Sequence, residues 1–162
     1  MVFDTKFLDS LSEQAKVNPR LRQMYDLRNS SEDNTQRFLN ALEPGTILPI
    51  HKHPSCNTVT ILLRGAIRHF EYDDNGNVTE QADIKQEGGF QPLIMIEANK
   101  WHNLECLESG TVIFEHKDAK YDPETEYLKI ASKKQHFTSI CKIKKIYLVP
   151  LSYRIFSPGR FI

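Results

Sequence analysis

Apolar residues recur at helical spacing near the amino terminus of the chain. Four of them fall on one side of a helix, three or four residues apart: Phe7, Leu8, Leu11 and Ala15. Asp4 stands just before them, where its side chain can accept from the first free backbone amides. The pattern predicts a helix over residues 5–17 that Pro19 ends. A second, shorter helical piece is predicted over residues 21–26.

After residue 36 the hydrophobic pattern changes to short apolar segments bounded by turn residues. These segments are RFLNAL, TILPIH, TVTILL, AIRHFEY, FQPLIMI, HNLECL and TVIFEH. Sequences rich in Gly, Asn, Asp and Ser, such as DDNGN and ESG, separate several of them. Strands at intervals of about 8–12 residues with turns between them predict an all-β sandwich or barrel.

The pattern divides the chain into three parts. Residues 1–36 form a predicted N-terminal helical segment and loop, residues 37–129 a β-barrel, and residues 130–162 a C-terminal extension. The extension holds seven of the 21 basic residues and none of the 21 acidic ones. It either binds an anionic partner or docks on the acidic remainder of the chain or on a second subunit.

The extension contains KKIYLVPLSYRIF, which is too apolar for a solvated arm. We therefore expect a strand-like extension that packs on the barrel or on a partner subunit. A homodimer is predicted, and no nucleic-acid partner is expected. The chain has no apolar run of about 20 residues that could span a membrane. Its three cysteines are widely spaced, without a disulfide framework, so a cytoplasmic location is predicted.

Two histidines stand one residue apart in the segment GTILPIHKHP. In a strand, alternate residues project from the same face, so His51 and His53 can bind one ion through two imidazoles. Such a pair also occurs often by chance. A third histidine, His102, follows EANKW at a turn between two apolar segments, where a neighbouring strand can bring it to the pair.

These residues resemble the two motifs of the cupin superfamily. Gly45-x5-His51-x-His53 followed by Gly65 resembles the first motif, Gly-x5-His-x-His-x3,4-Glu-x6-Gly. The segment IEANKWH resembles the second, Pro-x-Gly-x2-His, and ends in His102.

Within the cupins, several segments together resemble the WbuC family of metalloproteins. They are QRFLNALEPGTILPIHKHP, LLRG, DDNGNV, KWHNLECLESGTVIFE and YDP. The resemblance implies a small antiparallel barrel of jelly-roll type. It also implies one divalent metal ion (Zn, Fe, Ni or Mn) held by His51, His53 and His102, with a small-molecule ligand.

The sequence departs from the family pattern at three positions. Thr58 stands where the family has its glutamate ligand, and a neutral hydroxyl is a poor replacement for a carboxylate on a divalent ion. Glu97 stands where proline is usual and Asn99 where glycine is. Because Asn tolerates a left-handed backbone better than most residues, the turn of the second motif can still form with Asn99.

A carboxylate from a neighbouring strand can compensate for Thr58. A two-residue hairpin at Arg64 and Gly65 would pair Thr58 with Glu71 and put His69 and Glu71 on the inward face. A one-residue bulge would instead turn the alternate set inward: Arg68, Phe70 and Tyr72. Under the first alternative, Glu71 supplies the missing carboxylate, directly or through water.

The resemblance also implies a setting in bacterial surface-polysaccharide biosynthesis. Our first hypothesis is a metal-dependent enzyme that acts on a small sugar-like molecule, with Glu71 or His69 transferring protons. Such an enzyme would be an isomerase or epimerase, or else a dioxygenase of the three-histidine iron type. A non-catalytic ligand-binding or regulatory cupin is the alternative that the absent glutamate favours.

Overall fold

A computed structural model describes residues 2–122 and 128–129 of the chain. Helix α1 spans Thr5–Val17, as predicted, and the side chain of Asp4 accepts a hydrogen bond from the amide of Phe7 at 3.0 Å. Among the described residues, no helix is long and apolar enough to cross a membrane. The predictions for residues 130–162 lie outside the described part of the chain, and the division into three parts stays a prediction.

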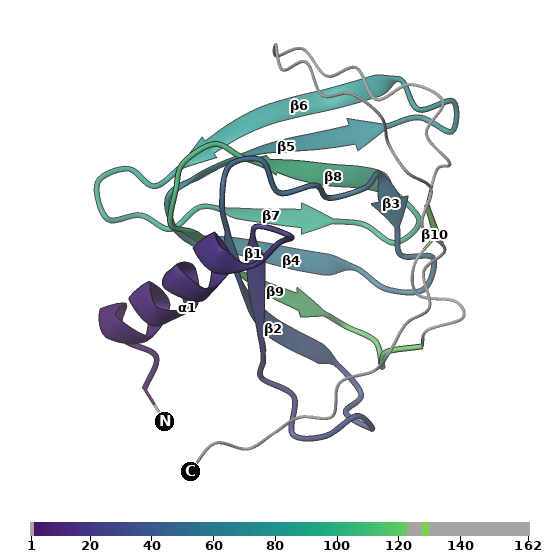
Figure 1. Ribbon diagram of the computed structural model, residues 1–162. Coiled ribbons are helices and arrows are strands. Elements are labelled where there is room, and N and C mark those ends of the chain that lie inside the picture. Colours follow the sequence, from purple (N-terminus) through teal and green to yellow (C-terminus); the bar gives the residue numbers. More distant parts are fainter. Residues whose placement is uncertain (1, 123–127, 130–162) are drawn as a thin grey trace. The chain divides into compact units, whose positions relative to one another are not determined.

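The strands form two antiparallel five-stranded sheets (Figure 1). The first, called sheet A, has the order β1 (Arg22–Asp26), β2 (Gln36–Leu42), β9 (Thr111–Lys117), β4 (Thr58–Arg64) and β7 (Leu93–Ile96). The second, sheet B, has the order β10 (Leu128–Lys129), β3 (His51–Lys52), β8 (Trp101–Cys106), β5 (Ala66–Tyr72) and β6 (Val78–Lys85). The mostly β, jelly-roll prediction is confirmed.

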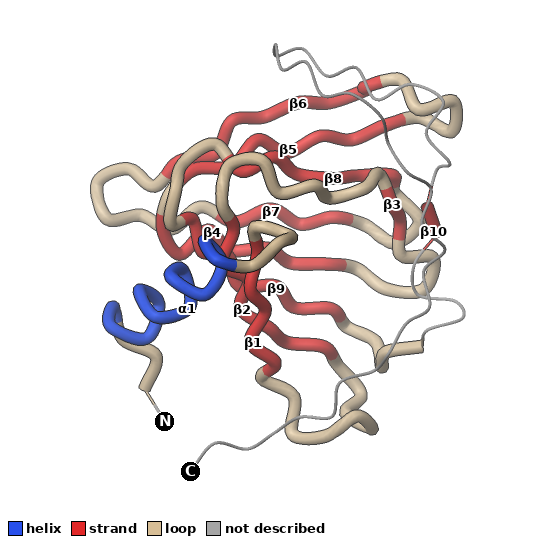
Figure 2. Tube along the Cα trace, in the orientation of Figure 1, coloured by secondary structure: helices blue, strands red, loops and turns tan. Residues whose placement is uncertain are grey.

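Three local predictions were wrong. Residues 22–26 form strand β1 rather than a helical piece, because they pair with β2 along their whole length. The predicted strand TILPIH is mostly a loop (Figure 2), and Pro49 within it has no amide to donate to a ladder. Strand β6 was not predicted, because its side chains are mostly polar and exposed.

The two sheets pack face to face through a buried apolar cluster. Its fully buried members are Leu42, Leu62 and Ile113 from sheet A, with Ile67 and Cys106 from sheet B. Removing this apolar surface from water is the main driving force for bringing the two sheets together.

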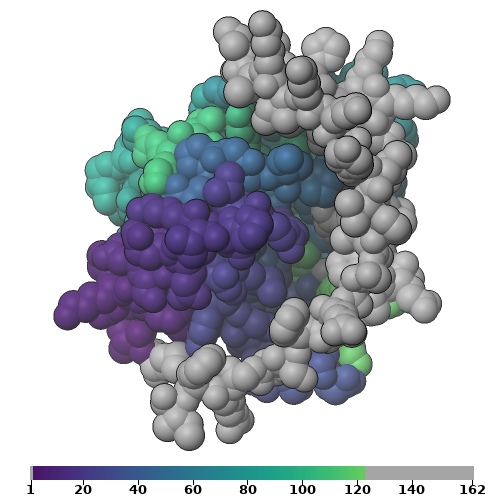
Figure 3. Space-filling model, viewed as in Figure 1, coloured from purple at the N-terminus to yellow at the C-terminus, as the bar shows by residue number. Residues whose placement is uncertain are grey.

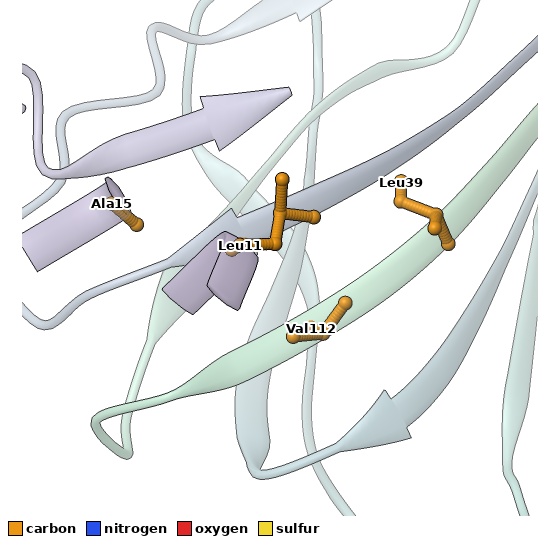
Figure 4. Packing of buried hydrophobic residues seen from close by; sticks show 5 residues of the cluster. Leu11, Ala15, Leu39 and Val112 are labelled. Atoms are coloured by element: carbon orange, nitrogen blue, oxygen red, sulfur yellow. The ribbon is translucent and has the colours of Figure 1, made fainter. Parts of the chain in front are cut away.

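The outer face of sheet A is also buried, at β2 and β9, because helix α1 lies across it. Figure 4 shows Leu11 and Ala15 of the helix close to Leu39 and Val112 of the sheet. In the space-filling view the amino-terminal residues, in purple, form a continuous part of the visible surface (Figure 3). Strands β2 and β9 are therefore apolar on both faces.

The chain passes from sheet A to sheet B at Gly65, so the predicted hairpin pairing of Thr58 with Glu71 was wrong. Thr111 prevents such a hairpin: its hydroxyl lies 3.2 Å from the amide of Ala66 and donates to the Ala66 carbonyl at 3.3 Å. Strand β4 pairs with β9 and β7, and β5 with β8 and β6.

Gly65→Ala should destabilise the fold strongly. A Cβ at this position would lie 2.2 Å from the hydroxyl oxygen of Thr111, on a backbone with φ of +84°. We expect a loss of about 2–6 kcal/mol from backbone strain and overpacking together.

The matched control is Gly110→Ala, which has φ of +75° but open space around the added methyl. It should lose only about 1–2 kcal/mol. Urea unfolding followed by circular dichroism measures both. Equal losses would contradict the close approach at Gly65.

Candidate metal centre

Three histidines converge at one end of the interior. His51 lies in β3, His53 follows it directly, and His102 lies in β8 opposite His51 in the ladder. One nitrogen from each ring lies within 4.8 Å of the others. Two nitrogens that bind a common ion lie at most about 4.2 Å apart, so small side-chain movements bring all three to ligand distance.

Backbone carbonyls hold two of the imidazole rings. The Nδ1 atom of His51 lies 2.9 Å from the carbonyl oxygen of Pro49, and that of His102 lies 2.8 Å from the carbonyl oxygen of Lys100. With Nδ1–H donating to these carbonyls, Nε2 carries the lone pair of each ring. Metal-binding histidines are commonly held in this way.

The turn before His102 ties the two histidine segments together. Asn99 has φ of +67°, the left-handed conformation expected where the family has glycine. Its amide donates to the carbonyl of His53 at 2.8 Å. The side chain of Asn57 accepts from the amide of Ala98 at 3.0 Å, so the residue before Thr58 also fixes this turn.

The electrostatic environment keeps the imidazoles of His51 and His102 neutral. Burial lowers the pKa of His51 from 6.5 to about 2, and the nearby His102 adds to this effect. Burial also lowers the pKa of His102, to about 4. Neutral imidazoles have the lone pair that a metal ion requires, so the donor set suits a divalent ion.

Thr58 lies at the start of β4, in sheet A, and only 2% of its surface is exposed. Its neighbours across the sheet are Ile96 and Lys117. Within the described part of the chain, its hydroxyl oxygen has no hydrogen-bond partner. The family's glutamate position is thus occupied by a small buried hydroxyl with unused hydrogen-bonding capacity.

Glu71 lies next to the histidines, although not by the hairpin proposed from the sequence. It pairs directly with His102 across β5 and β8, and paired residues share a face. Its side chain is 14% exposed, and Oε2 lies 3.0 Å from Nζ of Lys100.

His69 is also buried on this inward face, with Nε2 3.7 Å from Oε1 of Glu71, beyond hydrogen-bond distance. The alternative of a bulge, which would turn Arg68 inward, is wrong. Arg68 forms ion pairs with Asp83 and Glu105 on the outer face.

The sequence did not reveal the polar residues on the inward face of sheet A. Glu115 and Lys117 follow Ile113 on that face, where Glu115 pairs with Thr60 and Lys117 with Thr58. Both faces of β9 carry apolar residues, so alternation could not show which face is inward. The only sequence feature that could have indicated Glu115 is its place as an acidic residue near the end of the apolar segment TVIFEH.

When bound, a divalent ion on three neutral imidazoles would act as a Lewis acid with open positions for oxygen ligands. His51, His53 and His102 are the residues that would hold it. Glu71 and His69 lie beside them and can hold or move a proton. The interior end of the two sheets is therefore a candidate centre for chemistry on a small polar molecule.

Solved structures of other proteins share the fold of this chain. CapF, the capsular polysaccharide assembling protein from Staphylococcus aureus, matches with a TM-score of 0.57 and 19% identity. This match covers 70% of the chain and 33% of CapF. Oxalate decarboxylase from Bacillus subtilis matches with a TM-score of 0.52 and 20% identity, over 67% of the chain and 27% of the enzyme.

KdgF from Halomonas sp. matches with a TM-score of 0.50 and 10% identity, over 67% of the chain and 87% of KdgF. The chain therefore spans only about a third of CapF but most of KdgF. No curated protein matches the chain. The chain belongs to the family described as "Domain of unknown function (DUF6016)", whose model matches residues 3–84.

The metal-free protein should lose stability as the pH falls below about 6.5. His51 and His102 have lower pKa values when folded than when unfolded, so the unfolded chain binds protons first. Their contribution to stability is full above the unfolded pKa of 6.5. The contribution of His102 is lost as the pH falls to about 4, and that of His51 keeps falling towards pH 2.

Urea midpoints between pH 7 and pH 4.5, measured with chelator present, test this prediction. His102→Gln should flatten the dependence, since glutamine does not titrate. His116→Gln, on the outer face of β9, should leave it unchanged. An equally steep dependence in His102→Gln would contradict the assignment.

Proposed function

We propose that the protein is a metal-dependent cupin enzyme acting on a small, polar, sugar-like molecule. His51, His53 and His102 are the proposed ligands of one divalent ion, and Glu71 or His69 transfers protons. The observation that carries the proposal is the convergence of three imidazole nitrogens within 4.8 Å, in two buried histidines and one partly buried histidine. The backbone carbonyls that fix two of these rings give further support.

We further propose that the reaction belongs to surface-polysaccharide biosynthesis. The sequence resemblance to WbuC-type cupins supports this setting. So does the fold shared with CapF, whose name describes it as assembling capsular polysaccharide. The homodimer and the cytoplasmic location expected from the sequence stay predictions.

Glu71 is the proposed replacement for the carboxylate that Thr58 cannot supply. It lies opposite His102 in the ladder and shares the inward face with it. The ion pair with Lys100 at 3.0 Å holds its carboxylate in place. In this position it can bind the ion directly or through a water molecule.

A binding protein without turnover is the second candidate, and Thr58 is the observation that favours it. Without a carboxylate at that position, the three imidazoles leave the ion with its full charge and weaker protein ligation. Whether the carboxylate of Glu71 contributes to metal binding distinguishes the two candidate functions.

His102→Ala should abolish stoichiometric metal binding. Loss of one of three imidazole ligands should weaken affinity by about 100-fold or more, beyond the usual effect of residues that only support a ligand. Elemental analysis and titration with zinc, iron(II), nickel and manganese measure this.

His116→Ala is the matched control, because this histidine lies on the outer face of β9. It should bind metal as the wild type does. A wild-type protein without bound metal after titration would overturn the proposed function.

Glu71→Gln should weaken metal affinity about 10–100-fold if the carboxylate contacts the ion or its bound water. Calorimetric titration of the metal-free protein gives the affinity. Glu105→Gln is the control, since Glu105 lies on the outer face of sheet B, in the neighbouring strand β8. An unchanged affinity in Glu71→Gln would reject Glu71 as the replacement and favour the binding protein.

A further inference from the structure

The interior between the sheets is apolar at one end and polar at the other. Beyond the cluster of Leu62, Ile113 and Cys106, the inward faces change to hydrogen-bonding and charged side chains. Those used below are Thr58, Thr60, Glu115 and Lys117 of sheet A, with His69 and His102 of sheet B. A barrel interior that served only stability would contain apolar residues here.

Glu115 is the carboxyl group of sheet A at this polar end. Oε2 accepts a hydrogen bond from the side-chain amide of Asn40 at 2.6 Å, which fixes its direction. Burial raises the pKa of Glu115, although Lys117 and Asn40 act against this effect. The side chain nevertheless keeps partial contact with solvent, so a proton can reach it.

Two buried polar atoms at this end have no hydrogen-bond partner in the described chain, namely the hydroxyl of Thr58 and Nε2 of His69. Their residues are 2% and 4% exposed and come from opposite sheets. A buried polar atom without a partner costs about 1–3 kcal/mol, so a bound molecule with hydroxyl groups would relieve this penalty on both sides.

We propose that Glu115 is a second proton-transfer residue, which acts on a hydroxy-carbonyl substrate from the sheet opposite Glu71, so that the site isomerises or epimerises such a substrate. This inference rests on the proposed function, because it takes the metal-binding site as the place of reaction. It selects isomerisation or epimerisation from the reactions expected from the sequence, and it adds the proton-transfer residue on the second face.

The geometry supports transfer on two faces. Glu71 lies on β5 in sheet B, beside His102, and Glu115 lies on β9 in sheet A, one alternate position from Lys117. The charge of Lys117 acts on His51, His102 and Glu115. Glu115 therefore belongs to the same polar region as the histidines, and a substrate between the sheets would have one carboxyl group on each side.

The step is balanced without an oxidant. The carboxylate of Glu71 removes a proton from the carbon next to the carbonyl, and the electron pair of the broken C–H bond forms an enediolate. Glu115 then donates its own proton to a carbon of the enediolate from the other face. Protonation of the same carbon gives the epimer. Protonation of the neighbouring carbon gives the isomer, with the hydroxyl proton of the enediolate passing to the former carbonyl oxygen. Solvent returns a proton to Glu115 and takes one from Glu71.

The test is exchange of carbon-bound hydrogen in deuterium oxide. Metal-loaded wild-type protein is incubated with dihydroxyacetone, glyceraldehyde, glucose, mannose and fructose, and NMR follows deuterium entering next to the carbonyl. We expect exchange with at least one of these probes. Glu115→Gln keeps the shape and an acceptor for Asn40 but cannot donate an acid proton, so formation of the epimer or isomer should fall about 100-fold or more, while exchange through Glu71 continues.

Two further variants complete the test. Glu115→Asp, which keeps the acid on a shorter side chain, should retain part of the epimer or isomer formation. Glu105→Gln, on the outer face, should exchange as the wild type does. Metal content is measured in every sample and should be equal in all of them.

The outcomes separate this inference from the proposed function. Wild type without metal overturns both. Wild type that binds metal but exchanges none of the probes overturns the proton-transfer assignment and leaves metal binding in place. Formation of the epimer or isomer by Glu115→Gln within a few-fold of wild type rejects Glu115 as the second residue.

Discussion

The transfer of the chain from one sheet to the other at Gly65 is the constraint on which the rest of the molecule depends. Thr111 lies against Gly65 so closely that no side chain fits there, and its hydroxyl contacts both the amide and the carbonyl of Ala66. Strands β4 and β5 are consecutive, but this crossing puts them in different sheets. Thr58 therefore lies in the sheet opposite the histidines, whereas Glu71 lies in their own sheet, next to His102.

This arrangement puts the histidines in one sheet and the polar side chains that face them in the other, whereas a hairpin of β4 and β5 would have put them in the same sheet. Sheet B holds His51 and His102 across one ladder pair, with backbone carbonyls fixing each ring. Sheet A contributes side chains that act from the other side of the interior. Burial favours the uncharged form of His51, His102 and Glu115 alike. The same burial thus lowers the pKa of the two imidazoles and raises that of the Glu115 carboxyl group.

Much of the fold and the histidine cluster could be predicted from the sequence, because each depends on a local pattern. Alternating apolar segments define strands, and histidines two residues apart share a face wherever the strand lies. Asn99 could be recognised as a left-handed position from its place in the turn. Strand β1 could not be predicted from the sequence, because its conformation depends on pairing with β2 rather than on its own residues.

Pairing partners and inward faces were the part that local patterns could not supply. The sequence placed Glu71 correctly on the inward face but for the wrong reason, since its partner is His102 and not Thr58. Glu115 was missed because helix α1 buries the outer face of β9, which makes both faces of that strand apolar. Where a helix covers one face of a strand and a second sheet covers the other, the alternation of apolar and polar residues no longer shows which face is inward.

The replacement of glutamate by Thr58 changes the charge of the site more than its shape. Three neutral imidazoles do not reduce the charge of a divalent ion, whereas a carboxylate ligand would halve it. Lys117, the ladder neighbour of Thr58, adds to the positive potential felt by His51 and His102. A site of this kind attracts oxygen ligands that carry or develop negative charge, as an enediolate does. With three imidazoles alone, a bound ion would keep its full charge for such a ligand, whereas direct binding by Glu71 would halve that charge again.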